Sequence, residues 1–189
     1  MKARILLIFV AILVCIIVVS SCVPSHNSTP ENYSNPLPDS TVRTMAINVA
    51  HTQMEWPDVT LCNIYTLYDF SGATVGYSVD VTNNQTNDHG YMFLCSLIND
   101  EPVMQFSKGP EAYSPYNSIS NKNDECIFDG VGAYYAKSMT KGKYYDLWTK
   151  KLLDSKTVNV FRKNDKSKDH ASPDPQKSQS EREELMESN

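Results

Sequence analysis

The chain lacks the residue patterns that most metalloproteins and nucleotide-binding enzymes carry. It has no Cys-x-x-Cys pair, no His-x-x-x-His pair and no clustered carboxylates of the EF-hand type, so the common zinc and calcium motifs are excluded. Only seven glycines are present, and none belongs to a glycine-rich loop that could cradle a phosphate group. We therefore expect no metal site and no cofactor.

Positive charge is also scarce. The formal net charge is −5 and the isoelectric point is about 5.3, whereas nucleic-acid-binding domains carry basic patches. We therefore expect no nucleic-acid partner. The same balance gives no electrostatic attraction to anionic lipid, so membrane contact is expected to come from the N-terminus alone.

The sequence begins with what we interpret as an export signal, residues 1–22. Two positive residues precede an apolar run of 15 residues at positions 5–19. This run is shorter than the roughly 20 residues of a membrane-spanning helix and is typical of a signal peptide. The tetrapeptide Val19-Ser20-Ser21-Cys22 resembles the lipobox of prokaryotic lipoproteins, in which the residue at the Cys22 position carries the lipid. Lipidation, a retained N-terminal helix and free secretion remain open, and all three place the rest of the chain outside the cytoplasm. We expect it on the extracytoplasmic face of the membrane, in the cell envelope.

Two polar segments flank one domain. Residues 23–38 are rich in proline, serine, threonine and asparagine, and residues 162–189 are charged and nearly free of apolar side chains. Such segments bury too little surface to offset the entropy of ordering, so we expect a disordered linker and a disordered tail. The domain between them spans residues 39–161, an ordinary size for one hydrophobic core. Three sequons in the chain are candidate glycosylation sites: Asn27, Asn32 and Asn84.

The domain changes its hydrophobic period after the first fifteen residues. Apolar residues recur at helical spacing over 39–54, which predicts an amphipathic helix. Beyond it, β-branched and aromatic residues alternate with polar ones between turn residues, which predicts strands joined by hairpins. The strands are expected at 59–68, 73–82, 91–98, 103–106, within 127–139 and at 144–148, while 158–161 is either a last strand or the start of the tail. The fold class is α+β, with the N-terminal helix packed on an antiparallel meander sheet of about five to six strands.

The central stretches resemble a known family. They are "LYDFSGATVGYSVDV" at 67–81 and "GYMFLCSLINDEPVMQFSKG" at 90–109, preceded by the helix and Trp56. Together they are similar to the pro-domain of streptopain-type cysteine peptidases and to related stand-alone exported proteins. The similarity covers about residues 40–115, and no peptidase domain follows it in this sequence.

This resemblance implies a function. In that family the module is a helix packed on an antiparallel sheet, which blocks the active-site cleft of a papain-like peptidase and assists its folding. We therefore expect an exported, membrane-anchored, non-catalytic binding module, with a cysteine peptidase as its partner. The alternative is an envelope lipoprotein with a structural or ligand-sensing role and no peptidase partner.

Candidates for catalysis are few, and we expect the chain not to be an enzyme. Nucleophilic chemistry would need a thiol beside a histidine, so the pairs to consider are Cys95 with His89 and Cys62 with His51. Neither cysteine follows a glycine-rich elbow or begins a helix, the settings that lower a thiol pKa. We name no catalytic residue, and a thiol enzyme is the third alternative.

Aromatic residues outside the strands are better candidates for contact. Tyr113 and Tyr116 lie with two prolines in the turn-rich segment 109–120, and aromatic side chains contribute much of the binding energy at interfaces. The tyrosines within the expected strands are interpreted as packing residues. We therefore expect residues 109–120 to form the contact loop, with Tyr113 and Tyr116 as its contact residues.

Overall fold

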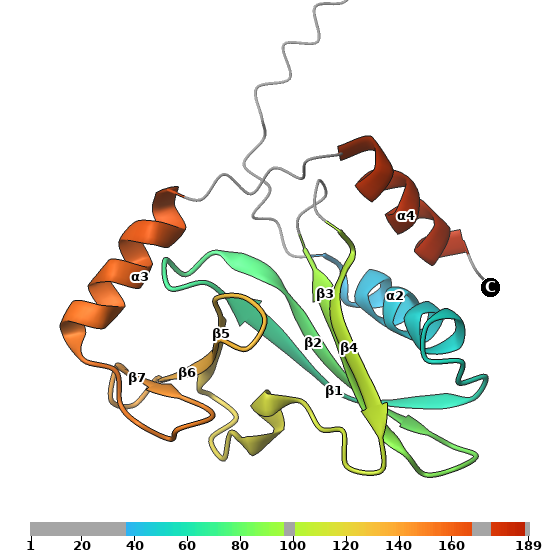
Figure 1. The fold of residues 1–189 in the computed structure, drawn as a ribbon, viewed down its shortest axis with the longest axis horizontal. Coiled ribbons are helices and arrows are strands. Elements are labelled where there is room, and N and C mark those ends of the chain that lie inside the picture. Colours follow the sequence, from blue (N-terminus) through green and yellow to red (C-terminus); the bar gives the residue numbers. More distant parts are fainter. Residues whose placement is uncertain (1–36, 97–100, 168–174, 188–189) are drawn as a thin grey trace, which may run out of the picture. The chain divides into compact units, whose positions relative to one another are not determined.

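The computed structural model describes residues 37–96, 101–167 and 175–187, which all belong to one unit running from Tyr33 to Asn189 (Figure 1). The expected export signal, the lipidation site Cys22 and the sequons at Asn27 and Asn32 lie outside the described residues. Within the described part, no helix is long and apolar enough to cross a membrane.

A seven-stranded sheet lies at the centre of this unit, in the order β4-β3-β2-β1-β5-β6-β7. The strands are β1 (Val59–Tyr68), β2 (Thr74–Asn83), β3 (His89–Cys95), β4 (Val103–Gly109), β5 (Glu125–Phe128), β6 (Tyr134–Ser138) and β7 (Lys143–Asp146). Neighbouring strands are antiparallel except β1 and β5, which are parallel. The predicted α+β class is confirmed, but the sheet has seven strands and is mixed.

The parallel pair results from a crossover between β4 and β5. β4 is one edge of the sheet, and β5 is added beside β1, on the far side of β2 and β3. Residues 110–124 make this connection and contain the short 3-10 helix η1 (Pro115–Ser118). Contacts of Ser114 with Ser78 and Asp80 on β2 hold the connection against the sheet. A crossover of this kind is set by distant contacts, so the local alternation of residues did not predict it.

The helix α2 (Asp39–Thr52) covers one face of the sheet, as predicted. Its buried apolar residues are Val42, Met45, Ala46, Val49 and Ala50, and they pack against Tyr77, Val79, Val81, Met92 and Leu94 of β2 and β3. After the helix, Glu55 takes a left-handed conformation with φ of 57°. The N–H of Trp56 then donates to the Ala50 carbonyl at 2.9 Å, which closes the C-terminal end of the helix.

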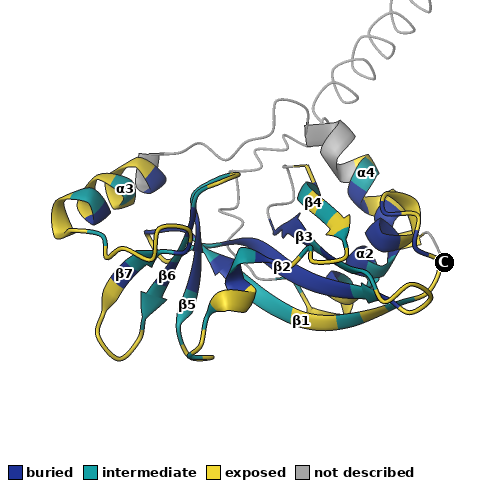
Figure 2. Cartoon of the chain, turned by 60° about the horizontal axis from the view of Figure 1, so that its bottom comes forward, coloured by how far each residue is buried: buried dark blue, intermediate teal, exposed yellow. Residues whose placement is uncertain are grey.

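The opposite face carries an aromatic core. The ring of Phe93 on β3 lies 5.4 Å from those of Phe128 and Tyr134, and Tyr116 lies 6.1 Å from Tyr134. These are distances at which edge-to-face ring pairs are favourable. Buried residues therefore line both faces of the strands β2 and β3 (Figure 2), with α2 over one face and the crossover connection over the other.

The C-terminal segment corrects the sequence prediction. A helix, α3 (Ser155–Ser167), replaces the last strand considered at 158–161 and continues past the expected domain boundary at 161. A second helix, α4 (Pro175–Glu187), lies in the stretch expected to be a disordered tail. The prediction rested on the low content of apolar residues, but Val158 and Phe161 anchor α3 and Leu185 anchors α4.

The anchors of these helices are specific. The Phe161 ring lies 4.8 Å from the Phe70 ring, and the Asp165 carboxylate accepts a bond of 2.8 Å from the Phe70 N–H. In α4, Leu185 is buried in the core beside α2, and the Asn48 side-chain amide donates to the Leu185 carbonyl. These contacts join residues about ninety or more positions apart, so composition alone does not reveal them.

Candidate functional site

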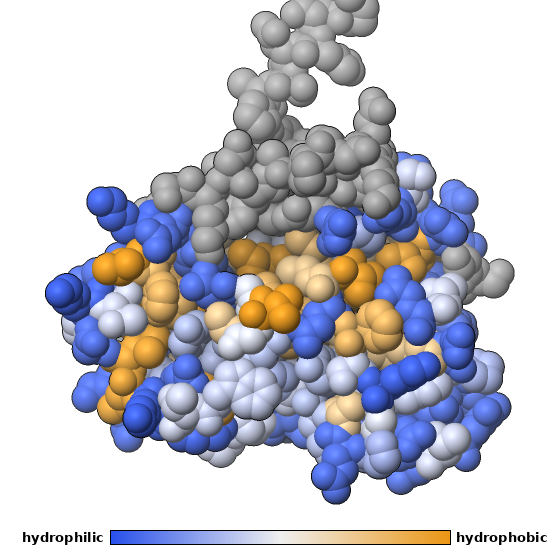
Figure 3. All heavy atoms as spheres, in the orientation of Figure 1, coloured by the Kyte–Doolittle hydropathy of each residue, from blue (hydrophilic) through white to orange (hydrophobic). Residues whose placement is uncertain are grey.

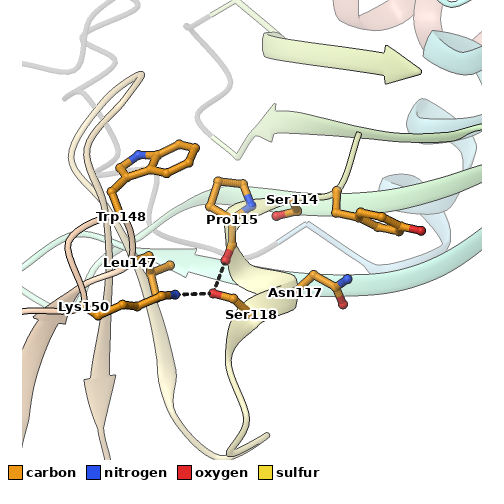
Figure 4. A pocket seen from close by; sticks show the side chains of 8 residues that line it. Ser114, Pro115, Asn117, Ser118, Leu147, Trp148 and Lys150 are labelled. Atoms are coloured by element: carbon orange, nitrogen blue, oxygen red, sulfur yellow. Dashed lines mark hydrogen bonds between the residues drawn. The ribbon is translucent and has the colours of Figure 1, made fainter. Parts of the chain in front are cut away.

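A mostly apolar groove lies between the crossover connection and the residues that follow β7 (Figure 4). Its volume is about 410 Å³. The residues that line it are Tyr113, Ser114, Pro115, Asn117, Ser118, Leu147, Trp148 and Lys150. We call it the aromatic groove, because its two large exposed side chains are Tyr113, 48% exposed, and Trp148, 64% exposed.

Buried polar contacts fix the first wall of the groove. The hydroxyls of Ser78 and Ser114 are 2.8 Å apart, and the Ser114 N–H donates to the Asp80 carboxylate at 3.3 Å. The Ser114 hydroxyl also accepts a bond from the Tyr116 N–H, which caps η1. Because all three polar side chains are buried, these bonds are shielded from water and hold Pro115 and Tyr113 in one position.

The Asp80 carboxyl is the main titratable group under this wall. Burial raises its pKa above the ordinary value of 3.8, while the Asn63 side chain, the Ser114 N–H and the nearby His89 act in the opposite direction. The carboxyl is 6% exposed and accepts from Asn63 and Ser114. By accepting the bond from the Ser114 N–H, the Asp80 side chain holds the loop in position against the sheet.

The second wall follows β7. The Asp146 carboxylate accepts bonds from the N–H groups of Trp148 and Thr149, at 2.8 and 2.7 Å, and Lys150 takes a left-handed conformation with φ of 57°. This tight turn presents the indole of Trp148 at the surface, with its centroid 5.9 Å from the buried Tyr134 ring. Trp148 is therefore supported from below while most of its surface stays exposed.

A side-chain hydrogen bond connects the two walls. The Lys150 ammonium donates to the Ser118 hydroxyl at 3.0 Å, and that hydroxyl donates to the Pro115 carbonyl at 2.8 Å (Figure 4). Pro115 of the first wall and the buried Leu147 contribute apolar lining to the groove. A mostly apolar lining that includes Trp148 and Tyr113, together with the Lys150 cation and the Asn117 amide, suits an extended polypeptide or another largely apolar ligand.

The two predicted contact tyrosines have different positions. Tyr113 is exposed beside the groove, where its ring lies 4.5 Å from that of His89. Tyr116 is fully buried, and its hydroxyl donates to the Ile127 carbonyl at 2.8 Å. The prediction that Tyr116 is a contact residue is therefore wrong, because the crossover turns this side chain into the aromatic core. Trp148 was not predicted, and no periodic pattern around it marked it as exposed.

The thiols differ in exposure. Cys62 on β1 is exposed, whereas Cys95 and Cys126 are buried. Burial, with a smaller contribution from Asp124, raises the pKa of Cys126 to about 12, so this thiol stays protonated at neutral pH. Cys95 and His89 are six residues apart on β3, which is about 20 Å along a strand, so this candidate pair does not form.

Three other polar side chains, Cys62, Thr82 and His89, lie next to one another on the strands β1, β2 and β3. The Cys62 sulfur lies 3.2 Å from the Thr82 hydroxyl, which lies 3.3 Å from Nδ1 of His89. The thiol therefore contacts the threonine rather than an imidazole, and His51, the histidine considered as its partner, is exposed on α2. Among the described residues, no group of three or more His, Cys, Asp or Glu side chains could hold a metal ion.

The sequon asparagine Asn84 lies on the exposed turn between β2 and β3. Its side-chain amide donates to the Asp58 carboxylate at 2.7 Å, and its side-chain carbonyl accepts from the Thr60 hydroxyl at 2.8 Å. Because the residue is exposed, its side-chain amide is accessible to modification.

Comparison with known proteins adds no further constraint. No family model, curated protein or solved structure matches the chain. Function is therefore proposed from the geometry of the aromatic groove, together with the resemblance expected from the sequence of residues 40–115.

Proposed function

We propose that the chain is an exported, membrane-anchored binding module without catalytic activity, and that its partner is a papain-like cysteine peptidase. In this proposal the module occupies the peptidase cleft and inhibits the enzyme or assists its folding. The aromatic groove and the loop at its edge form the contact surface. The N-terminal apolar run and the lipobox-like tetrapeptide support the export and anchoring part of the proposal.

The observation that carries this proposal is the pair Tyr113 and Trp148. They are exposed by 48% and 64% on opposite walls of one apolar groove, and buried aromatic anchors provide much of the energy of protein interfaces. Both are held in place by hydrogen bonds or ring contacts before any partner binds. Such pre-organisation reduces the entropy lost on binding.

The span of the resemblance supports the choice of partner. Residues 40–115 correspond to α2 and the strands β1 to β4, a helix packed on an antiparallel meander, and they end in the loop that carries Tyr113. β4 is an edge strand of the sheet, so its outer backbone groups are available for pairing with an extended segment. Both the loop and this edge agree with inhibition by occlusion.

The thiols support a non-catalytic role. Two of the three cysteines in the domain are buried, and the third contacts a threonine hydroxyl instead of a base. A nucleophilic cysteine needs an adjacent base or a lowered pKa. Burial raises the pKa of the Cys126 thiol, which keeps this thiol in its neutral form instead of the nucleophilic thiolate.

The test is affinity capture of purified papain-like peptidases on the immobilised chain, followed by measurement of the inhibition constant. Trp148→Ala and Tyr113→Ala should each weaken binding about 10- to 100-fold, the range for an aromatic anchor. Phe106→Ala reports on the strand edge, since Phe106 is 40% exposed on β4. Val160→Ala on α3 is the control, because this exposed residue lies outside the groove.

Absence of binding by every peptidase would contradict the proposal and favour the alternative, an envelope lipoprotein with a structural or ligand-sensing role. Binding that is insensitive to Trp148→Ala and Tyr113→Ala but lost in Phe106→Ala would move the contact from the groove to the β4 edge.

A further inference from the structure

One long strand in the middle of the sheet has a free edge. β1 pairs with β2 from Val59 to Tyr68, but with β5 only at Leu67 and Tyr68. Among the described residues, no strand therefore lies beside Val59–Thr66 on the β5 side, and β1 runs along the lower border of the cartoon in Figure 2. At roughly 3.3 Å per residue this stretch is about 26 Å long, as long as an ordinary strand.

The strands β5 and β6 turn away from this free edge. The Tyr134 hydroxyl on β6 donates to the Gln105 side chain on β4 at 2.8 Å, although β3, β2, β1 and β5 lie between β4 and β6 in the sheet order. In a flat sheet these two strands would be about 24 Å apart. The contact therefore requires β5 and β6 to fold back over the face that carries η1, away from the space beside Val59–Thr66.

The backbone of this stretch can form hydrogen bonds outward. Successive residues of an antiparallel strand turn their N–H and C=O groups to alternate sides. The Asn83 N–H donates to the Asp88 carbonyl, so Asn83 faces β3 and the preceding residue, Thr82, faces β1. Thr60 is opposite Thr82 and faces β2. The next residue, Leu61, therefore turns its backbone groups to the free side.

A β-bulge changes the alternation in the middle of the stretch. The register of β1 against β2 shifts between Leu61 and Asn63, so Cys62 has no opposite residue on β2. Asn63 faces β2, because its partner on β2, like the partner of Thr60, faces β1. Ile64 therefore turns its backbone groups to the free side, as Leu61 does before the bulge.

Because of this bulge, the side chains of the free stretch alternate symmetrically. Val59, Leu61 and Ile64 pack against the cluster under α2, and Thr66 lies opposite Tyr77 of that cluster. The other four residues point to the face that carries η1: Thr60, Cys62, Asn63 and Tyr65. The order of faces is therefore the same from residue 59 to 66 as from residue 66 to 59, which is the order that antiparallel pairing with an identical strand requires.

Two common protections of a sheet edge are absent from β1. Natural edge strands carry charged residues, above all lysine, or proline. The strands at the two ends of the sheet follow this rule, since β4 contains Lys108 and follows Pro102, and β7 contains Lys143 and Asp146. The sequence of β1, VTLCNIYTLY, has neither a charge nor a proline. Two copies of this strand would pair without like charges opposite each other.

Pairing at this edge depends on the backbone and not on an apolar patch. In Figure 3 the lower border of the molecule, along which β1 runs in Figure 1, is mostly hydrophilic. The exposed side chains of the stretch, Thr60, Cys62 and Asn63, are small or polar. Such an edge suits main-chain hydrogen bonding to an added strand.

We propose that a second copy of the chain pairs with the free stretch of β1, antiparallel and about a twofold axis between Cys62 and Asn63. In this register Leu61 of one copy lies opposite Ile64 of the other, and their outward backbone groups form hydrogen bonds between the chains. The two sheets join edge to edge, with both α2 helices on one side. A strand of another protein would need only the free edge, whereas the symmetrical order of faces and the lack of charge favour a second copy.

The inference is independent of the peptidase proposal. No residue of β1 lines the aromatic groove, and the β4 edge stays free when two copies pair through β1. A substitution that separates the copies should therefore leave peptidase inhibition unchanged, so the two proposals can fail separately.

The experiment measures self-association of the purified full chain in detergent by analytical ultracentrifugation. We expect dimers that dissociate on dilution. Cys62→Lys places two lysines beside the twofold axis and should weaken association at least about tenfold. Phe106→Lys puts the same charge on β4, the opposite edge, where Phe106 is 40% exposed, and should leave association unchanged. Circular dichroism verifies that both variants fold.

A second measurement locates the interface in the wild-type chain. Cys62 is exposed, and its two copies lie on one face of the joined sheet, so a short bismaleimide should link them. Peptide mass spectrometry identifies this product, which necessarily joins two chains. Amide hydrogen exchange at Leu61 and Ile64 should also slow as protein concentration rises. A monomer at every concentration, dimers that persist in Cys62→Lys, or dimers without the Cys62–Cys62 product and the slowed exchange would each overturn the inference.

Discussion

The carboxylate of Asp80 on β2 accepts a hydrogen bond of 3.3 Å from the backbone N–H of Ser114 in the crossover connection. This bond joins the sheet to the loop that carries Tyr113 and Pro115, so the sheet positions one wall of the aromatic groove. The carboxylate accepts a second bond from Asn63 but remains buried. Burial outweighs these bonds, and the pKa of Asp80 is raised.

The raised pKa predicts a pH dependence of stability. A carboxyl in the unfolded chain titrates near pH 4, and in the folded protein Asp80 holds its proton to higher pH. The folded state therefore binds more protons in this window, and the free energy of unfolding falls as pH rises from about 4 through the folded pKa. Asp80→Asn removes this decrease, so the stability of the variant relative to wild type should rise across the window, as measured by urea unfolding at several pH values.

The control for this prediction is Glu111→Gln, which removes an exposed carboxylate from the same connection and should keep the wild-type profile. A difference between Asp80→Asn and wild type that is constant with pH, or that falls as pH rises, would contradict the assignment.

Gly76 on β2 tests the packing of the central strands. A Cβ atom at this position would lie 2.2 Å from the Leu94 carbonyl oxygen of β3, and backbone atoms cannot move aside without disturbing the sheet. Gly76→Ala should lower the free energy of unfolding by about 3 kcal/mol or more. Gly130→Ala is the matched variant, because Gly130 has open space around it but a φ of 109°. Only strain of about 1–2 kcal/mol is expected there, and a larger loss at Gly130 than at Gly76 in denaturant unfolding would be inconsistent with this packing.

Thiol labelling tests the assignment of the cysteines. In the native protein at neutral pH an alkylating reagent should modify the exposed Cys62, and leave Cys95 and Cys126 protected until the chain unfolds. The pKa of about 12 for Cys126 adds to the protection that burial gives it. Peptide mass spectrometry before and after denaturation gives the order of labelling. Rapid native labelling of Cys126 would contradict the fold around β5.

Local sequence patterns predicted the part of the fold that depends on local contacts. The strand β1 was predicted with its observed bounds, and the helical stripe predicted over 39–54 packs as expected, on a helix that ends at Thr52. The addition of β5 beside β1 was missed, because it depends on a crossover that no alternation of residues encodes. The C-terminal helices were missed because each is anchored by a few contacts with distant residues, such as Phe161 with Phe70.

The candidate site was predicted only in part, again because the sequence pattern reveals local contacts and not distant ones. The turn-rich composition of residues 109–120 indicated the loop, and Tyr113 is exposed there. The same composition gave no sign that Tyr116 turns into the core. The second wall, with Trp148, is joined to the first only through tertiary structure, so sequence proximity did not associate the two.

Phe161 tests whether α3 belongs to the folded domain. Its ring contacts Phe70 and Tyr135, at centroid distances of 4.8 and 5.8 Å, so Phe161→Ala should reduce the free energy of unfolding by about 2 kcal/mol. The adjacent Val160 is 50% exposed, and Val160→Ala should change it by less than about 0.5 kcal/mol. Equal effects of the two variants in thermal unfolding would mean that α3 does not pack on the sheet.

The most direct test of the central claim is a titration of an active papain-like peptidase with the chain, following hydrolysis of a small fluorogenic substrate. We predict competitive inhibition that saturates at one chain per peptidase and is weakened about 10- to 100-fold by Trp148→Ala. Unchanged hydrolysis at saturating chain, for every peptidase that the chain captures, would contradict the account.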